Sequence, residues 1–295
     1  MPAESYATVA RGPVGSMPLV AAADGIDPNN PPWSSPTAFA IWIASVLFIL
    51  FIPFIAVLPY ALSKASGAAN YAQALREALL DKTALLISIV AIIPTHLLTL
   101  AVVWAVVTRF GKRPFWRSLG WSFSEHFGFW TSAGLAVVLL IIGGTISYLA
   151  GGEPTQVDRI VASSTATRYA LALLAATTGP LIEELVYRGV LYSAFQRTLG
   201  MIWAVVFVAI LFTLVHVLQY YNNLGVITVI FILSISLTLV RAYTGRLLPC
   251  FVMHMVFNGI QSLYLVLAPY LEKTSTGEQK AAALRHLARA LHGFI

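Results

Sequence analysis

The chain has 295 residues, of which 58% are hydrophobic and only 10% are charged. Soluble domains carry about 25% charged residues, so this composition excludes an ordinary soluble globular protein and indicates a polytopic membrane protein. The formal net charge of +6 is distributed among short loops. We therefore relate it to membrane topology and to anionic lipid, and expect no nucleic-acid partner.

Residues 1–36 are rich in Pro, Gly, Ala and Ser and contain no apolar core of their own. The order of a signal peptide, a basic region followed by an apolar one, is missing. The segment is therefore predicted to be a flexible N-terminal tail, and the first apolar segment is predicted to serve as the uncleaved targeting signal.

Apolar segments long enough to cross a bilayer, about 20 residues each, follow one another along the rest of the chain. They lie near residues 37–62, 83–108, 127–150, 168–187, 201–219, 224–241 and 247–268. Since the bilayer core offers no water to the backbone, each segment should be a helix. The expected fold is an all-α polytopic membrane protein, a bundle of about seven to eight transmembrane helices over residues 37–268.

Basic residues follow the second, fourth and sixth of these segments, whereas the loop 151–167 carries acidic residues and only one arginine. The positive-inside rule then places the N-terminus and the loop 109–126 in the cytoplasm. Seven spans would send the basic C-terminal stretch outside, and this conflict leaves the span count open. Residues 269–295 are predicted to be an amphipathic or disordered tail, because Leu284, Leu287 and Leu291 recur at helical spacing.

The stretch IEELVYRG, residues 182–189, brings two adjacent carboxylates and a guanidinium into the fourth span. Charged groups at bilayer depth cost at least about 2.5–3.5 kcal/mol each, so they usually face a cavity and serve function. Glu184 and Arg188 share one helix face and can pair. Two interpretations stay open: a structural ion pair with a partly wetted second carboxylate, or a supporting pair beside a reactive Glu183. Repulsion between carboxylates in low dielectric makes one of them a better base near neutral pH.

Two further sets of polar residues interrupt the apolar spans. His216 is the only ionisable group in its span, and a lone histidine is more often a packing residue than a catalyst. If the fourth and fifth spans turn near Leu199, however, Glu183 and His216 lie at matching depth. His254 and Asn258 are four residues apart on one face of the last span, as either an interhelical hydrogen-bonding pair or two donors to one small cavity.

Three other positions are assigned structural roles. Gly179 and Pro180 predict a kink that frees backbone groups in the fourth span. His96 has no polar companion within its own span and is interpreted as structural. Cys250 is the only cysteine, which excludes an intrachain disulfide, and it is predicted to be a packing residue.

A carboxylate, two histidines and an amide on three helices suit the hydrolysis of an amide bond. Glu183 would take a proton from water, His216 would hold that water, and His254 and Asn258 would donate hydrogen bonds to the oxyanion. The set Glu183, His216 and His254 would alternatively suit a catalytic zinc ion with one open position. His-Glu-x-x-His and Gly-x-Ser-x-Gly motifs are absent, and no aspartate lies inside a span, so a glutamate-centred site remains.

Three motifs together resemble a known family: EELVYR at 183–188, FTLVH at 212–216 and HMVFN at 254–258. In order and in span position they are similar to the motifs of the CPBP family, the CAAX prenyl endopeptidases and bacteriocin-processing or immunity proteins, also called the Abi family. The resemblance covers roughly residues 168–268, which we take as the catalytic core. The remaining spans match only as generic membrane segments.

The resemblance implies a multi-pass intramembrane endopeptidase of the cell membrane with its cavity open to the cytoplasm. It makes Glu183 the water-activating base with His216 beside it, His254 and Asn258 the oxyanion site, and Glu184 and Arg188 the supporting pair. Members are often labelled metalloproteases; a metal-free mechanism is favoured here because Asn258 beside His254 suits an oxyanion site. The expected substrate is a membrane-associated or prenylated peptide.

Two alternatives stay open. A catalytically silent family member, such as an immunity or scaffold protein, would bind peptides without cutting them. A small-solute carrier would use the buried Glu and His residues as a proton relay, but the repeated halves of many carriers are not found in this sequence.

Overall fold

The computed structural model describes residues 26–274, and within this range the regular structure is entirely helical. The first half of the bundle comprises α1 (Ser35–Ala65), α2 (Tyr71–Leu79), α3 (Lys82–Val90), α4 (Ile92–Thr108), α5 (Phe115–Ser118), α6 (Phe129–Ala150) and α7 (Gln156–Ser163). The second half comprises α8 (Thr165–Ala176), α9 (Thr178–Glu184), the π-helix η1 (Leu185–Leu191), α10 (Tyr192–Leu199), α11 (Met201–Tyr220), α12 (Leu224–Thr244) and α13 (Leu248–Thr274).

Seven of the described helical segments are long and apolar enough to cross a membrane, which confirms the all-α polytopic fold. They are Ser35–Ala65, Lys82–Thr108, Phe129–Ala150, Thr165–Leu199, Met201–Tyr220, Leu224–Thr244 and Leu248–Leu271. The basic C-terminal stretch with Leu284, Leu287 and Leu291 lies outside the described residues. Its predicted amphipathic character therefore stays a prediction.

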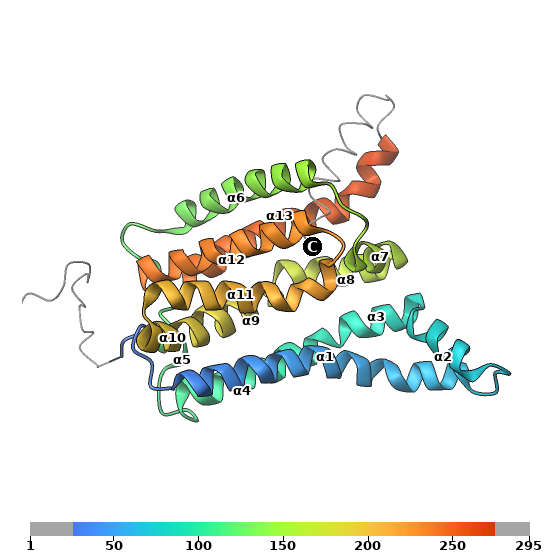
Figure 1. The fold of residues 1–295 in the computed structure, drawn as a ribbon, viewed down its shortest axis with the longest axis horizontal. Coiled ribbons are helices and arrows are strands. Elements are labelled where there is room, and N and C mark those ends of the chain that lie inside the picture. Colours follow the sequence, from blue (N-terminus) through green and yellow to red (C-terminus); the bar gives the residue numbers. More distant parts are fainter. Residues whose placement is uncertain (1–25, 275–295) are drawn as a thin grey trace, which may run out of the picture.

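Among the seven spans, α12 is the most deeply buried. It packs against α11, α6 and α13. In Figure 1, α1 runs beside α4 along one side of the bundle, and α6 lies along the opposite side next to α12 and α13. The most apolar window of α12 is 56% buried against 17% for that of α1. Leu50, Phe51 and Ile55 of α1 are exposed. Because lipid replaces water as the solvent of such side chains, exposed apolar residues on an outer helix favour membrane insertion.

The fourth span is not a single regular helix. It breaks at Thr177, whose φ of −127° and ψ of −85° lie between α8 and α9, and it then passes from α9 into the π-helix η1. Pro180 has no backbone N–H to donate to the carbonyl of Ala176, so the regular hydrogen-bonding pattern fails at this point. The kink expected from Gly179 and Pro180 is present, and π-helical turns are frequent at functional sites.

Residues 27–34 form a strap that lies against the ends of α10 and α12. Arg197 donates to the carbonyl oxygens of Pro31 (2.6 Å) and Trp33 (3.1 Å), and the fully buried Arg241 donates to Oδ1 of Asn29 (2.6 Å). The predicted flexible tail over 1–36 is therefore too long at its C-terminal end. Local sequence does not predict these contacts, because Arg197 and Arg241 lie more than 150 residues away from the strap.

Candidate functional site

Glu184, Arg188 and His254 form a hydrogen-bonded triad in the interior of the bundle. One carboxylate oxygen, Oε1 of Glu184, accepts from a terminal guanidinium nitrogen of Arg188 at 2.9 Å and lies 2.8 Å from Nδ1 of His254. The side chains of Glu184 and Arg188 are completely buried and that of His254 is 2% exposed. The predicted Glu184–Arg188 pair is present, and its contact with His254 is an addition that helix spacing within one span does not predict.

Arg188 uses its remaining donors on α12. Its Nε donates to Oγ1 of Thr238 at 3.3 Å, and its second terminal nitrogen donates to the backbone oxygen (3.1 Å) and Oγ (2.8 Å) of Ser234. Ser234 and Thr238 are one helical turn apart, so both face the guanidinium. A buried cation is tolerated only when it is paired and hydrogen-bonded, and these contacts meet that requirement at the centre of the membrane bundle.

His254 also approaches the other carboxylate. Its Nε2 lies 3.7 Å from Oε2 of Glu183, whose side chain is 32% exposed. Because an ionised carboxylate only accepts hydrogen bonds, the contact with Glu184 makes Nδ1 of His254 the donor. The imidazole is thereby held with Nε2 turned to Glu183. Two adjacent glutamates thus occupy opposite environments, one sealed and one accessible.

Phe212 of α11 connects the two histidines. Its ring packs against the ring of His216 at 4.8 Å between centroids and against that of His254 at 6.0 Å, and the guanidinium carbon of Arg188 lies 4.7 Å from its centroid. Nδ1 of His216 lies 2.7 Å from the backbone oxygen of Phe212, which makes Nδ1–H the donor and leaves Nε2 as the acceptor. The phenylalanine of the FTLVH motif therefore packs against both histidines and Arg188.

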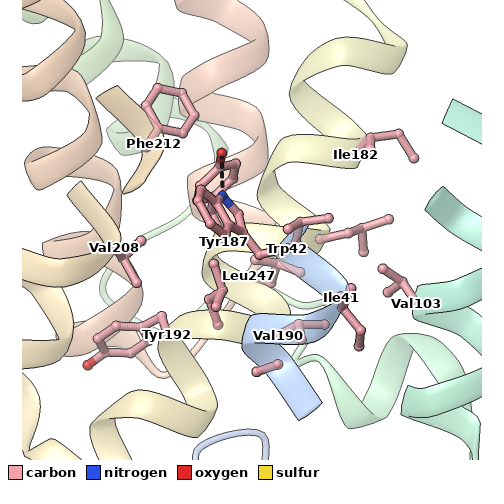
Figure 2. Close-up of a cluster of buried hydrophobic side chains, with 14 of the residues drawn as sticks. Ile41, Trp42, Val103, Ile182, Tyr187, Val190, Tyr192, Val208, Phe212 and Leu247 are labelled. Atoms are coloured by element: carbon pink, nitrogen blue, oxygen red, sulfur yellow. Dashed lines mark hydrogen bonds between the residues drawn. The ribbon is translucent and has the colours of Figure 1, made fainter. Parts of the chain in front are cut away.

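Phe212 also belongs to a cluster of buried hydrophobic side chains (Figure 2). Tyr187 of η1 packs edge-on against Phe212 at 5.0 Å between ring centroids, and its hydroxyl accepts a hydrogen bond of 3.0 Å from Nε1 of Trp42. Trp42 belongs to α1, so the first span also fixes the helix that carries Glu183 and Glu184.

Asn258 makes a contact that the sequence did not predict. Its Nδ2 donates to the backbone oxygen of Ala175 at 3.2 Å, one of the carbonyls near the break at Thr177. One of its two N–H groups is therefore engaged with α8. The other is the group that remains for an oxyanion, so this predicted role of Asn258 stays a prediction.

His96 of α4 is an additional histidine near the site. One of its ring nitrogens, Nδ1, lies 2.9 Å from Oγ1 of Thr178, the first residue of α9. Glu183 of the same helix is its acidic neighbour. The structural role predicted for His96 depended on the lack of a polar companion within its own span. The acidic neighbour comes from another helix. The one signal in the sequence for a site role of His96 is that an ionisable residue occurs within an apolar span.

The described residues do not provide a metal site of the expected kind. Within residues 26–274, no three His, Cys, Asp or Glu side chains are grouped so that they could hold a metal ion. In the zinc set Glu183, His216 and His254, both histidines use Nδ1 on protein oxygens, of Phe212 and of Glu184. Zinc-binding histidines usually engage their other ring nitrogen in this way, so it is the spacing of the three side chains within residues 26–274 that does not fit a three-ligand zinc centre. No step below involves a metal.

Comparison with known families agrees with the placement of this site. Residues 165–260, about a third of the chain, match the family model described as type II CAAX prenyl endopeptidase Rce1-like. The segment that carries the site is thus similar to this family. It contains all six residues of the predicted site, and the predicted resemblance to the CAAX prenyl endopeptidases is confirmed. Searches of curated proteins and of solved structures found no match.

The Rce1-like segment implies a peptidase, and the seven apolar helices make it a multi-pass membrane protein. Of its site residues, the structure brings Glu183, Glu184, Arg188 and His254 into one cluster. His216 joins this cluster through Phe212. Trp42 and His96 lie outside the Rce1-like segment, so the first two spans also contribute to the surroundings of the site.

Proposed function

We propose that this protein is an intramembrane endopeptidase that hydrolyses a peptide bond in a membrane-associated or prenylated peptide. The observation that carries the proposal is the contrast between the two glutamates. Glu184 is completely buried and saturates its Oε1 with Arg188 and His254, whereas Glu183 is partly accessible and faces Nε2 of His254. We therefore assign Glu183, and not Glu184, to contact with water and substrate.

In the proposed reaction, Glu183 takes a proton from a water molecule as the water oxygen attacks the carbonyl carbon of the scissile bond. The carbonyl oxygen becomes an oxyanion in the tetrahedral intermediate. Glu183 then gives the proton to the departing nitrogen, so that the same carboxylate serves as base and acid. His216, through Nε2, is assigned to hold the attacking water.

His254 is assigned to the oxyanion together with the free N–H of Asn258. In its protonated form His254 donates Nδ1–H to Glu184 and Nε2–H to the oxyanion. Glu183, Glu184, Arg188 and His254 then carry no net charge together, which suits a site of low dielectric. Fixed donors aimed at a developing oxyanion often make the largest contribution to such reactions.

The basic loops support a location of the site on the cytoplasmic side of the cell membrane. The loop after α5 and the turn between α12 and α13 both belong to the predicted cytoplasmic set, and the N–H of Leu247 donates to the carbonyl of Gly120 at 2.9 Å. Two loops assigned to one side by their charge are thus in contact.

Replacement of Glu183 tests the proposed function. The protein, reconstituted in lipid vesicles, is given quenched fluorescent peptides that end in a Cys-a-a-X sequence, with and without a prenyl group on the cysteine. Glu183→Gln keeps size and polarity but removes the base, so we expect cleavage to fall by about 10²–10⁴-fold. Glu77→Gln, the same change at an exposed position of α2, should cleave as the wild type does.

The prenylated and unprenylated peptides separate the two substrate classes by their kcat/KM. Unchanged cleavage by Glu183→Gln would refute the assigned base. A wild-type protein that binds these peptides without cutting any of them would instead identify the catalytically silent family member.

A further inference from the structure

The side chain of Gln261 on α13 is buried but has no hydrogen-bond partner. It is 1% exposed, and neither Nε2 nor Oε1 is paired. The hydroxyl of the adjacent Ser262 is also buried without a partner. Buried polar atoms in proteins are nearly always hydrogen-bonded, and those that are not usually have a functional or solvent partner that the protein alone does not supply. In a membrane span, lipid cannot be that partner.

Gln261 lies on the face of α13 that carries the site. It follows His254 by seven residues and Asn258 by three, so at about 100° per residue it is rotated by about 20° from His254 around the helix axis. The distance from His254 along that axis is about 10 Å. Gln261 is therefore a continuation of the His254–Asn258 row toward the C-terminal end of α13.

The row begins against α8, which is joined to α13 at two points along its length. The backbone oxygen of Ala175 accepts from Asn258, and the hydroxyls of Tyr169 and Tyr270 are 2.6 Å apart. Between Asn258 and Tyr270 along α13, the Gln261 amide has no hydrogen-bond partner among the described residues. The protein thus places a free amide beside the broken part of the fourth span, in line with its proposed oxyanion donors.

A primary amide presents one acceptor and two donors in a plane. This pattern complements the C=O and N–H of one residue in an extended peptide, which point to the same side of the strand. A peptide that enters the membrane in extended form has backbone groups that water no longer satisfies, so an intramembrane peptidase must offer partners to them. An extended chain advances about 3.3 Å per residue, and 10 Å therefore corresponds to about three residues.

We propose that Gln261 binds the substrate backbone about three residues from the bond that is cut, through its amide oxygen and nitrogen. The assignment rests on the proposed peptidase function and makes Gln261 a positioning residue of that site. Such a contact recognises the peptide backbone and not a side chain. The substrate must therefore be extended near the cleaved bond, with backbone groups that are not already hydrogen-bonded.

The test pairs a change in the protein with a change in the peptide. Gln261→Met fills a similar volume without polar atoms, and a peptide series replaces one backbone amide at a time by an ester, which removes one N–H. We expect Gln261→Met to raise KM by about tenfold with little change in kcat. The ester at the third residue from the cleaved bond should raise KM for the wild type by a similar factor but leave Gln261→Met unaffected.

Ser147→Ala serves as the matched control, because it also removes a buried polar group without a partner, the Ser147 hydroxyl on α6. It should change neither KM nor the ester profile. The thermal unfolding temperature of Gln261→Met should be no lower than that of the wild type, since an unpaired buried polar group is removed. Unchanged kinetics in Gln261→Met would show that the amide holds only a buried water, and an equal loss with every ester would show a structural role. Either result overturns the proposal.

Binding separates this proposal from the proposed function. If the wild type cuts no peptide, the peptidase function fails, and peptide affinity measured by fluorescence anisotropy takes the place of KM. Weaker binding to Gln261→Met that depends on the third-residue amide would then still support the backbone contact. Equal affinities would refute it.

Discussion

Glu183 and Glu184 are neighbours in the chain, yet their surroundings differ completely. Glu184 is sealed by Arg188 and His254, whereas Glu183 keeps part of its surface open. A buried carboxylate is stable only with such partners, and the accessible one is free for chemistry. The surroundings of the two glutamates thus depend on side chains far apart in the chain, such as His254 on α13.

The contribution of Arg188 to the site depends on the shape of its guanidinium group as well as on its charge. Its three guanidinium nitrogens serve Glu184, Thr238 and Ser234. Lysine carries one ammonium group on a flexible stem and does not reproduce this fork. We expect Arg188→Lys to leave part of this network unpaired, lower the thermal unfolding temperature and reduce cleavage by at least about tenfold. Arg159→Lys, at an exposed position in α7, is the control, and an Arg188→Lys protein of wild-type stability and activity would contradict the prediction.

At the scale of elements, the fourth span is the one that departs from regularity. A straight helix through residues 165–199 would keep its backbone groups paired along its length. The break at Thr177 and the π-helix η1 instead leave the Ala175 carbonyl to Asn258. Gly179 and Pro180 predicted this break, but the partner that uses the freed carbonyl comes from α13 and was not predictable from local sequence.

The start of α3 gives a prediction about pH. Asp81 caps this helix by accepting from the N–H groups of Thr83 and Ala84 and also accepts from the hydroxyl of Tyr60. Burial raises the pKa of Asp81, but these hydrogen bonds to the charged form outweigh it, so the pKa lies below its ordinary value. The ionised carboxylate therefore stabilises the fold above a pH of about 4, and this contribution is lost as the pH falls through the lowered pKa.

Loss of a helix N-cap costs about 1 kcal/mol, or about 2 °C in a chain of this size. We expect Asp81→Ala to lower the unfolding temperature in detergent by about this amount at pH 7. The difference from the wild type should shrink below about pH 4. Asp81→Asn keeps an accepting oxygen and should retain most of the stability, with less dependence on pH; an Asp81→Ala difference that stays constant down to pH 3 would refute the capping role.

The whole molecule combines an Rce1-like segment, about a third of the chain, with further spans that pack against it. The first span supplies Trp42 to the hydroxyl of Tyr187, and the strap before it covers the ends of α10 and α12. The strap, the loop around Gly120 and the turn at Gly245 all meet at the same end of the bundle. This end carries the basic residues that the positive-inside rule assigns to the cytoplasm.

This topology can be measured with single cysteines, because Cys250 is the only native one and is fully buried. In a Cys250→Ala background, Lys112→Cys marks the predicted cytoplasmic end and Ser66→Cys the opposite end, both at exposed positions. We expect a membrane-impermeant maleimide to label Ser66→Cys in intact cells and Lys112→Cys only after permeabilisation. The reverse pattern would place the site on the other side of the membrane.

The sequence by itself determined the spans and the family motifs, because hydropathy over about 20 residues and the order of motifs are properties of the chain. It also paired Glu184 with Arg188, since residues four apart on a helix must share a face. Tertiary structure alone decided that His254 joins Glu184 while facing Glu183, that Asn258 turns to Ala175, and that residues 27–34 are bound. These contacts depend on the rotation and depth of helices relative to one another, which packing sets and local sequence does not encode.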